Sequence, residues 1–378
     1  MLKAYKYRLY PNKQQEEQIQ KTFGCCRFVY NQALAYRKEL YKNKKESMNK
    51  IACNNYVNQV LKKEYKWLKE VDKFALTNSV YNMDSAYQKF FKEHSGYPKF
   101  KSKRDNKKSY TTNCTNNNIE ASFKKNKIKL PKLKWVKAKI HRTAPNDWTI
   151  KSATISQSCS GRYYVSVLYE YEHTITPVTP SKEKVIGLDY STPHLYVDSN
   201  GFSPTEKLKH YKLSAEKLSK EQRKLSKKII GSNNWKKQNL KVNKVHCKIA
   251  NQRKDSLHKI STAIAKQYDV VVIEDISIKE QIQSRKYKNY RKSTLDNGWY
   301  NFITMLDYKL KERGKQLIKI NKYYPSSQIC NCCGYTNPLL KEDSVRKWVC
   351  PSCGVVHNRD TNSAINIKNE GIRILGIA

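Results

Sequence analysis

The sequence Cys330-Asn331-Cys332-Cys333 is followed, after sixteen residues, by Cys350-Pro351-Ser352-Cys353, and soon afterwards by His357-Asn358-Arg359-Asp360. Two Cys-x-x-Cys pairs at this separation are typical of a tetrahedral zinc ribbon. The expected ligands are Cys330, Cys333, Cys350 and Cys353. Cys332 is one cysteine more than such a site needs, and an alternative pairing through it stays open. Four thiolates leave no open coordination position, so we expect a structural zinc ion.

The composition indicates a nucleic-acid partner. The chain has 378 residues, with 74 Lys and Arg against 32 Asp and Glu, and its formal net charge is +42. Such an excess of one sign repels itself in a compact fold unless phosphate groups neutralise it. A coding bias toward Lys, Asn, Tyr and Ile would explain why Lys outnumbers Arg, but not the twofold excess of cations over anions.

Several classes of protein are disfavoured by the sequence. No apolar run approaches the roughly 20 residues that a membrane span requires. The N-terminal residues alternate like a strand and lack the apolar core of a signal peptide. We therefore expect a protein of the reducing cytoplasm, where eleven cysteines favour metal binding over disulfides. No G-x-x-x-x-G-K-[ST] motif occurs, so we expect no nucleotide cofactor.

Three changes of pattern divide the chain. After the opening strand, residues 12–97 carry apolar side chains at helical spacing, which begins behind Pro11-Asn12 and ends at Gly96-Tyr97-Pro98. Residues 98–180 contain short alternating runs typical of strands. From Val185 onward, strands alternate with helices, and this order favours a mixed α/β sheet.

A basic and aromatic segment lies between Lys99 and Lys151. It has sixteen Lys or Arg and three acidic residues, interleaved with Phe100, Tyr110, Phe123 and Trp135. Cations and flat rings together suit a surface that follows a nucleic-acid backbone and stacks on its bases. The alternative is a solvated sheet with ordinary core aromatics.

Three acidic residues are candidate ligands of a catalytic metal. Asp189 ends the apolar run 185–188, Glu274 ends the run 270–273, and Asp360 stands where a helix is expected to begin. Ligand sites recur at the carboxyl ends of strands in α/β sheets. Hard oxygen ligands favour Mg²⁺ or Mn²⁺, and two such ions can activate water and stabilise the leaving oxygen of a phosphodiester.

Asp275 directly follows Glu274, but neighbouring side chains on a strand point to opposite faces. We expect Glu274 to face the site because it closes the apolar run. Taken singly, each acid is more commonly a cap or turn residue than a metal ligand. The order of the three, with the ribbon before the last, favours a metal site.

Four motifs carry a resemblance to a known family: IGLD at 186–189, VVIEDI at 271–276, the paired Cys-x-x-Cys and NRDTNSAINI at 358–367. With these motifs the sequence resembles the TnpB family of transposon-encoded RNA-guided nucleases, which are relatives of type V CRISPR effectors. Supporting matches are RLYP at 8–11, YPKFKS at 97–102 and NQRKD at 251–255. The resemblance spans the chain. Two departures are Ser191 and Ser363, where family members often carry Gly and Ala; both replacements are small, so we expect activity to survive them.

The resemblance implies an α+β multidomain fold. Its RNase H-like (RuvC) α/β nuclease domain would carry an inserted zinc ribbon. The other two domains would be a helical recognition domain and a β-barrel wedge domain. The expected boundaries are 1–11 and 98–180 for the wedge barrel, 12–97 for the helical domain, 181–324 and 357–378 for the nuclease domain, and 325–356 for the ribbon. We also expect the basic segment from Lys279 to Lys292 to be either a lid over the active site or an ordinary surface loop.

The resemblance further implies an RNA-guided DNA endonuclease that binds a transposon-derived guide RNA, recognises a short target-adjacent motif and cleaves double-stranded DNA. Asp189, Glu274 and Asp360 would hold Mg²⁺ or Mn²⁺, and the four ribbon cysteines one Zn²⁺. We expect no membrane partner, a monomer in the ribonucleoprotein with an oligomer left open, and a prokaryotic location at the nucleoid. The alternatives are a nuclease-inactive RNA-guided repressor and an accessory transposition protein.

Overall fold

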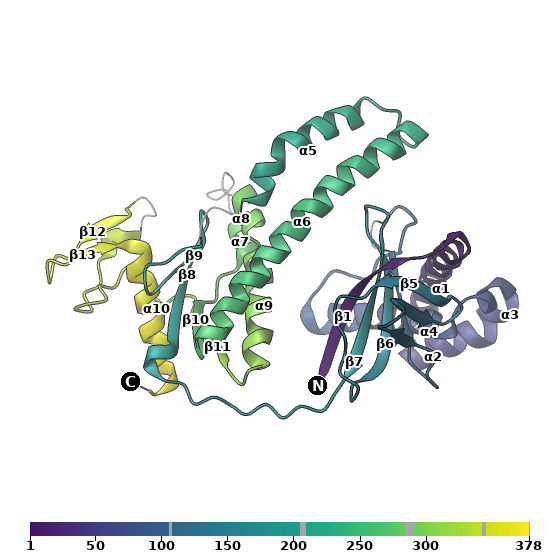
Figure 1. The fold of residues 1–378 in the computed structure, drawn as a ribbon, viewed down its shortest axis with the longest axis horizontal. Helices are drawn as coiled ribbons and strands as arrows, with labels where there is room; N and C mark the ends of the chain where they lie inside the picture. The colour runs from purple at the N-terminus through teal and green to yellow at the C-terminus, as the bar shows by residue number, and fades with distance from the viewer. Residues whose placement is uncertain (106–107, 205–208, 284–290, 342–344, 378) are drawn as a thin grey trace. The chain divides into compact units, whose positions relative to one another are not determined.

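The computed structural model describes the chain except for residues 106–107, 205–208, 284–290, 342–344 and 378 (Figure 1). The described residues form two compact units, Met1–His173 and Thr174–Ala378. Within the described part of the chain, none of the helices combines the length and the apolar character needed to cross a bilayer.

The first unit contains a seven-stranded antiparallel sheet in the order β2-β6-β7-β1-β5-β4-β3. Its strands are β1 (Leu2–Tyr10), β2 (Lys108–Asn113), β3 (Glu120–Ser122), β4 (Lys127–Leu130), β5 (Lys134–Lys139), β6 (Thr149–Gln157) and β7 (Tyr163–Glu170). The first strand of the chain lies between β7 and β5, so one sheet is built from two separate segments of sequence. The edge strands β2 and β3 do not pair with each other, so backbone hydrogen bonds among the described residues do not close the sheet into a barrel.

The helices of the first unit are inserted between β1 and β2. They are α1 (Lys13–Lys44), α2 (Lys50–Tyr56), η1 (Val57–Leu61), α3 (Lys62–Glu64), η2 (Lys66–Glu70) and α4 (Lys73–Glu93). The predicted start behind Pro11-Asn12 is confirmed: Asn12 accepts from the Gln15 amide at 2.8 Å, and the Gln15 side chain accepts from the Asn12 amide. Helices and strands share one hydrophobic core.

The second unit is built on a four-stranded sheet in the order β11-β10-β8-β9. Its strands are β8 (Val185–Ser191), β9 (Leu195–Asp198), β10 (Val270–Glu274) and β11 (Gln316–Ile320). β8, β10 and β11 are parallel, and β9 is antiparallel to β8. Leu188 pairs with Ile273, so the carboxyl ends of β8 and β10 lie level with each other. The predicted alternation of strands and helices is confirmed.

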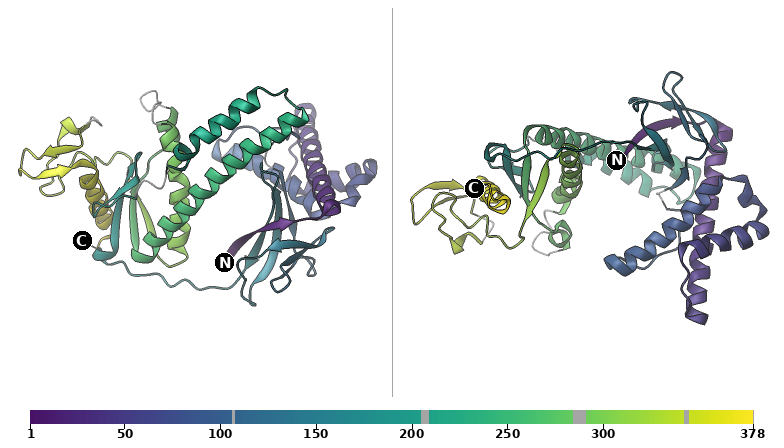
Figure 2. Two further views of the ribbon diagram at one scale, coloured as in Figure 1. Left: turned by 45° about the horizontal axis from the view of Figure 1, so that its top comes forward. Right: turned by 90° about the horizontal axis from the view of Figure 1, so that it is seen from below.

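Helices cover both faces of this sheet. α6 (Asn233–Gln267) and α9 (Trp299–Lys311) pack on the face that carries Ile186, Leu188, Val271 and Ile273. α10 (Arg359–Leu375) packs on the opposite face, where Val270 and Val272 meet Ile367. α5 (His210–Ser226) pairs with α6 in a hairpin that projects beyond the sheet (Figures 1 and 2). The remaining helices are η3 (Lys182–Lys184), α7 (Ile278–Gln283), α8 (Arg291–Asn297) and η6 (Pro338–Lys341).

A two-stranded ribbon precedes α10. β12 (Lys347–Val349) pairs with β13 (Val356–Asn358), and α10 begins at the next residue. The last ribbon strand therefore extends two residues past the expected ribbon boundary at 356 and continues into the helix without a loop. Asn358 ends the strand and caps the helix by accepting from the Asp360 and Thr361 amides.

Two glycines allow α10 to approach the sheet closely. A Cβ atom at Gly187 on β8 would lie 2.2 Å from the Ala364 carbonyl oxygen and 2.6 Å from the Lys368 amide nitrogen. A Cβ atom at Gly371 on α10 would lie 2.3 Å from the Val272 side chain. Any larger residue at either position must displace the helix, so these contacts fix the height and direction of α10 above β8 and β10.

Gly187→Ala is expected to destabilise the second unit. The added methyl group meets backbone atoms that cannot rotate away, and overpacking of this kind costs about 1–3 kcal/mol. Urea unfolding followed by circular dichroism measures the loss. Gly24→Ala in α1, where a Cβ would meet no atom within 4 Å, is the control and should not destabilise the chain. Equal unfolding midpoints for Gly187→Ala and wild type would contradict the close packing.

Candidate functional site

The side chains of Asp189 and Glu274 leave the sheet on the face that α10 covers. Strand alternation puts Asp189 on the same side as Gly187, and Glu274 on the same side as Val272. Since β8 and β10 are parallel and in register, both carboxylates stand at one edge of the sheet.

Asp360 reaches the same edge from the helix. It lies one turn before Ala364, the residue that touches Gly187, and helical periodicity gives both residues the same face of α10. The helix N-terminus points toward the strand ends, so Asp360 comes close to Asp189. The structure thus brings together the three acids that the sequence singled out.

The pKa values of the acids reflect their burial and their proximity to one another. Burial, and then the nearby charges of Glu274 and Asp360, raise the pKa of Asp189 well above its ordinary value. Burial also raises the pKa of Glu274, opposed by a hydrogen bond from Ser326. Like charges in a partly desolvated site repel each other, and a bound cation would offset that repulsion. The donor set is all carboxylate oxygen, which fits Mg²⁺ or Mn²⁺.

The acids are not drawn into a tight cluster. Among the described residues, three or more potential ligand atoms lie within 4.8 Å of one another only in groups that contain Cys330. Asp360 is instead engaged by Arg346, whose Nη1 lies 2.9 Å from its Oδ1. Arg346 precedes β12, and its carbonyl accepts from the Arg359 amide at 2.9 Å. This contact could not be predicted from the sequence, because Arg346 belongs to no motif.

A short chain of buried hydroxyl groups ends on Glu274. Ser326 donates to Glu274 Oε1, and Ser363 Oγ lies 3.0 Å from Ser326 Oγ. Ser363 is the residue that departs from the usual Ala of the family motif. Its hydroxyl group, which an alanine would lack, has a hydrogen-bond partner in Ser326. Sequence reasoning missed Ser326, which follows a proline in a segment without periodicity.

Asp275 lies outside this site. It is exposed and accepts from the Lys319 ammonium group at 2.8 Å, on a neighbouring strand. The expectation that only one of the two adjacent acids faces α10 is confirmed by strand geometry.

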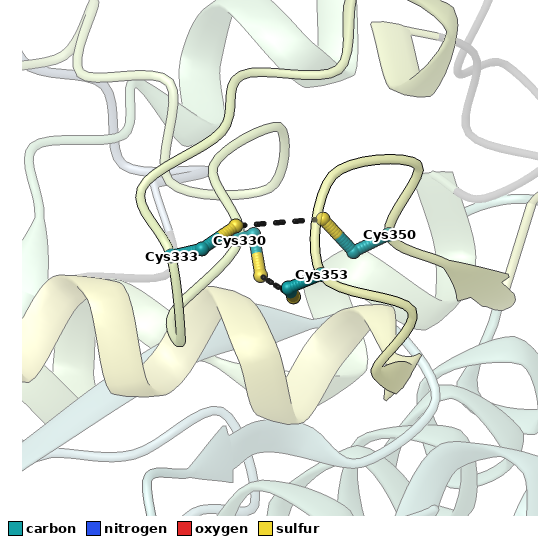
Figure 3. A group of neighbouring side chains, drawn as sticks. All are labelled: Cys330, Cys333, Cys350 and Cys353. Carbon is teal, nitrogen blue, oxygen red and sulfur yellow. Dashed lines mark hydrogen bonds between the residues drawn. The ribbon is translucent and has the colours of Figure 1, made fainter.

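The four ribbon cysteines form a compact cluster (Figure 3). Sγ of Cys330 lies 3.7 Å from that of Cys353, and Sγ of Cys333 lies 3.6 Å from that of Cys350. With Zn–S bonds near 2.3 Å, the edges of a tetrahedral site measure about 3.8 Å. The sulfur spacing therefore fits zinc.

Both cysteine pairs have the same backbone geometry. The Cys330 amide donates to the Tyr335 carbonyl at 2.8 Å, and the Cys350 amide to the Val355 carbonyl at 2.9 Å. Each turn closes at a glycine with positive φ, +75° at Gly334 and +71° at Gly354. Cys332 is exposed and is not one of the four clustered sulfurs.

Two asparagines join the ribbon to α10. Asn362 and Asn366 both donate to the Ile329 carbonyl at 2.7 Å. The Asn362 side-chain oxygen also accepts from the Asn331 amide at 3.0 Å, and Asn366 donates to the Ser326 carbonyl at 2.8 Å. The segment that carries the first cysteine pair is thus fixed directly to the helix that carries Asp360.

The predicted basic and aromatic surface is present only in part. Phe100 and Trp135 are exposed, as stacking requires, whereas Tyr110 is buried and Phe123 packs against the core. The Lys38 ammonium group lies 4.7 Å from the Phe100 ring centre and 4.9 Å from that of Tyr97. These rings and cations offer a surface for bases and phosphates.

The expected lid falls largely outside the described residues. Residues 284–290 are not described, and the flanking segments are the short helices α7 and α8. In the described part, Glu280 accepts from the Lys322 ammonium group at 2.6 Å. The lid stays a prediction.

Three family models match the chain. Their descriptions are "Helix-turn-helix domain" for residues 1–46, "Probable transposase" for residues 166–285 and "Cas12f1-like, TNB domain" for residues 299–367. Residues 1–46 contain β1 and α1 in this structure.

Two relatives match nearly the whole chain. A Streptomyces pristinaespiralis protein named "Putative RNA-guided DNA endonuclease" is 33% identical over 374 residues, which cover 98% of this chain and 89% of the relative. "Putative RNA-guided DNA endonuclease InsQ" of Escherichia coli K12 is 34% identical over 390 residues, covering 99% and 93%. A solved Cas12f1-sgRNA-target DNA complex contains a chain with a TM-score of 0.61 at 13% identity, covering 98% of this chain and 99% of that one. This last likeness is one of fold.

Cys350→Ser is expected to remove most of the bound zinc and to lower the stability of the second unit, because metal binding and folding are coupled in such lobes. Elemental analysis of the purified protein measures zinc, and thermal unfolding measures stability. Cys332→Ser is the matched control and should keep one zinc ion per chain. Full zinc content and unchanged melting in Cys350→Ser would contradict the assignment.

Proposed function

Because the chain belongs to the TnpB family, we propose that it is an RNA-guided DNA endonuclease that binds a transposon-derived guide RNA, recognises a short target-adjacent motif and cleaves double-stranded DNA at one RuvC-type site. The observation that carries the proposal is the convergence of Asp189, Glu274 and Asp360 at one sheet edge beneath α10. The net charge of +42 supports RNA and DNA as partners.

We assign the parts of the chain accordingly. Residues 181–324 and 357–378 form the RNase H-like nuclease domain, 325–356 the zinc ribbon, 12–97 the helical recognition domain, and 1–11 with 98–180 the wedge domain. The position of β1 within the sheet of the first unit supports the split wedge. Because the proposed target is DNA, we expect the protein to act in the prokaryotic cytoplasm, at the nucleoid.

Asp189, Glu274 and Asp360 would hold Mg²⁺ or Mn²⁺, which supplies an activated water and neutralises the leaving oxygen when bound. The chain's own residues prepare the site. Gly187 and Gly371 set the distance between the helix and the strands. Ser326 holds one oxygen of Glu274 in place, and Arg346 does the same for Asp360. The partly buried position limits water at Asp189 and strengthens its electrostatic interactions.

A nuclease-inactive repressor is the less favoured reading. Such a protein has no need to retain all three acids, and the repulsion among them costs stability unless a cation is held there. An integrase-like transposase is also disfavoured, because its acids follow the order Asp, Asp, Glu, whereas this chain has Asp189, Glu274 and Asp360.

Sequencing the RNA that co-purifies with the protein tests the guided activity. A defined non-coding RNA, and cleavage only of DNA complementary to its guide segment, is the expected result. Recovery of random cellular RNA would favour a generic nuclease instead.

Asp189→Ala is expected to abolish Mg²⁺-dependent cleavage while leaving RNA binding nearly intact, because the acid would hold the metal and belongs to the second unit, whereas the exposed rings and cations described above belong to the first. Loss of several kcal/mol of charge stabilisation corresponds to a fall in rate of about a thousandfold or more. Cleavage of a matched DNA duplex and RNA filter binding are the measurements. Asp275→Asn is the control and should cut normally; undiminished cutting by Asp189→Ala would falsify the role of the first acid.

Ser326→Ala is expected to raise the Mg²⁺ concentration needed for half-maximal cleavage, and to do so more at pH 6 than at pH 8. The Ser326 hydroxyl stabilises the ionised form of Glu274, so its loss raises the pKa of Glu274 and protonates the ligand at higher pH. Loss of a hydrogen bond to a charged group of this kind corresponds to an increase of about tenfold in the required Mg²⁺ concentration.

Magnesium titrations at the two pH values check this prediction, with Ser327→Ala as the neighbouring control. The same Mg²⁺ requirement for Ser326→Ala and wild type at both pH values would remove Ser326 from the site.

A further inference from the structure

We propose that His357 is a positioning residue of the cysteine site, and that its imidazole N–H donates a hydrogen bond to the metal-bound thiolate of Cys330. Nε2 of His357 lies 3.1 Å from Sγ of Cys330. Both residues are buried, with 6% and 1% of their surface exposed. The zinc ion is part of the proposed function, but this role concerns the stability of the metal site and not the cleavage of DNA.

The imidazole is held in place from the other side. His357 on β13 pairs with Trp348 on β12, and their ring centres lie 4.7 Å apart. The indole packs against the imidazole and restricts its rotation. A buried ring nitrogen requires a hydrogen-bond partner, and the Cys330 sulfur supplies one.

The chemistry of the cluster favours a donor at this point. Four thiolates around one Zn²⁺ carry more negative charge than the metal neutralises, so their sulfurs accept hydrogen bonds well. A donated N–H reduces the electron density on the sulfur and makes that thiolate a poorer target for acids and electrophiles. Partners of this kind orient the ligands and tune the affinity for the metal.

A ligand role for His357 is the competing possibility. Cys330, Cys332 and His357 also place ligand atoms within 4.8 Å of one another. That group offers only three ligands, and Cys332 is exposed and contacts the Asn331 side-chain oxygen at 3.2 Å. In the four-sulfur group, all ligand atoms lie within 4.8 Å of one another, and two opposite edges have the length expected around a zinc ion. In this proposal Cys330 binds zinc and also accepts the hydrogen bond, and His357 stays outside the coordination sphere.

The hydrogen bond has a structural consequence. His357 is followed by Asn358, the cap of α10, and Asp360 lies two residues further on. No loop separates them, so a displacement of His357 moves the first turn of the helix. Zinc at Cys330 thus stabilises the position of Asp360 through β13, in addition to the contacts of Asn362 and Asn366.

Two variants of His357 in the full chain, purified with its RNA, test the proposal. His357→Phe keeps an aromatic ring against Trp348 but removes the N–H, whereas His357→Gln keeps a side-chain N–H. Zinc transfer to a chromophoric chelator is expected to be about 10- to 100-fold faster for His357→Phe than for wild type, with His357→Gln in between. Wild type and Cys332→Ser should release zinc at the same rate.

Cobalt substitution separates a donor from a ligand. Wild type, His357→Phe and Cys332→Ser should show the same visible absorption bands of Co²⁺ in a four-sulfur site. A change of these bands in His357→Phe would make His357 a ligand, and a change in Cys332→Ser would bring Cys332 into the coordination sphere. Either result overturns the proposal.

Zinc release gives the remaining outcomes. A wild-type rate in His357→Phe, or equally fast release from the Gln and Phe variants, would exclude the hydrogen bond. If the Phe variant does not fold, a change of the Co²⁺ bands in His357→Gln would still overturn the proposal, because it would make His357 a ligand. None of these measurements requires nuclease activity. A chain that fails to cut DNA would still test the role of His357, so the two proposals fail separately.

Discussion

The contact between α10 and the sheet is the constraint on which the candidate acid site depends. Gly187 and Gly371 allow backbone and β-carbon atoms to touch where other residues would hold the helix away. This contact sets Asp360 beside acids that belong to two different strands. The same contact has a cost, because it brings the charges of Glu274 and Asp360 near the buried carboxyl group of Asp189. Arg346 and Arg359 offset part of this repulsion, and a cation bound by the three acids would offset more of it.

Much of this arrangement could be predicted from local patterns. Asp189 and Glu274 each end an apolar run, and such runs identify buried parallel strands whose ends meet at one edge. Asn12 and Gln15 form the capping box that their spacing indicates. The cysteine spacing identified four sulfurs that cluster in space. In each case the residues that form the feature follow a regular period or a fixed spacing, and this spacing allows the feature to be predicted from the sequence.

Contacts between residues without such a pattern could not be predicted. Arg346 reaches Asp360, and Ser363 reaches Ser326, only because the ribbon folds back on α10. Tyr110 and Phe123 show the same limit, since a basic segment with aromatic residues does not reveal which rings face the core. The open edges of the first sheet depend on which strands pair, and strand pairing over long separations has no local signature.

The central position of β1 has a consequence for biosynthesis. Its partner β7 begins at Tyr163, so the strand made first waits for one made roughly 160 residues later, about 10–30 s at ribosomal rates. Tyr7 and Leu9, which are buried in the finished sheet, cannot complete their burial until β7 has been made. The sheet of the first unit therefore reaches its final pairing late in synthesis, and until β7 has been made the N-terminal strand can pair on that edge with another chain.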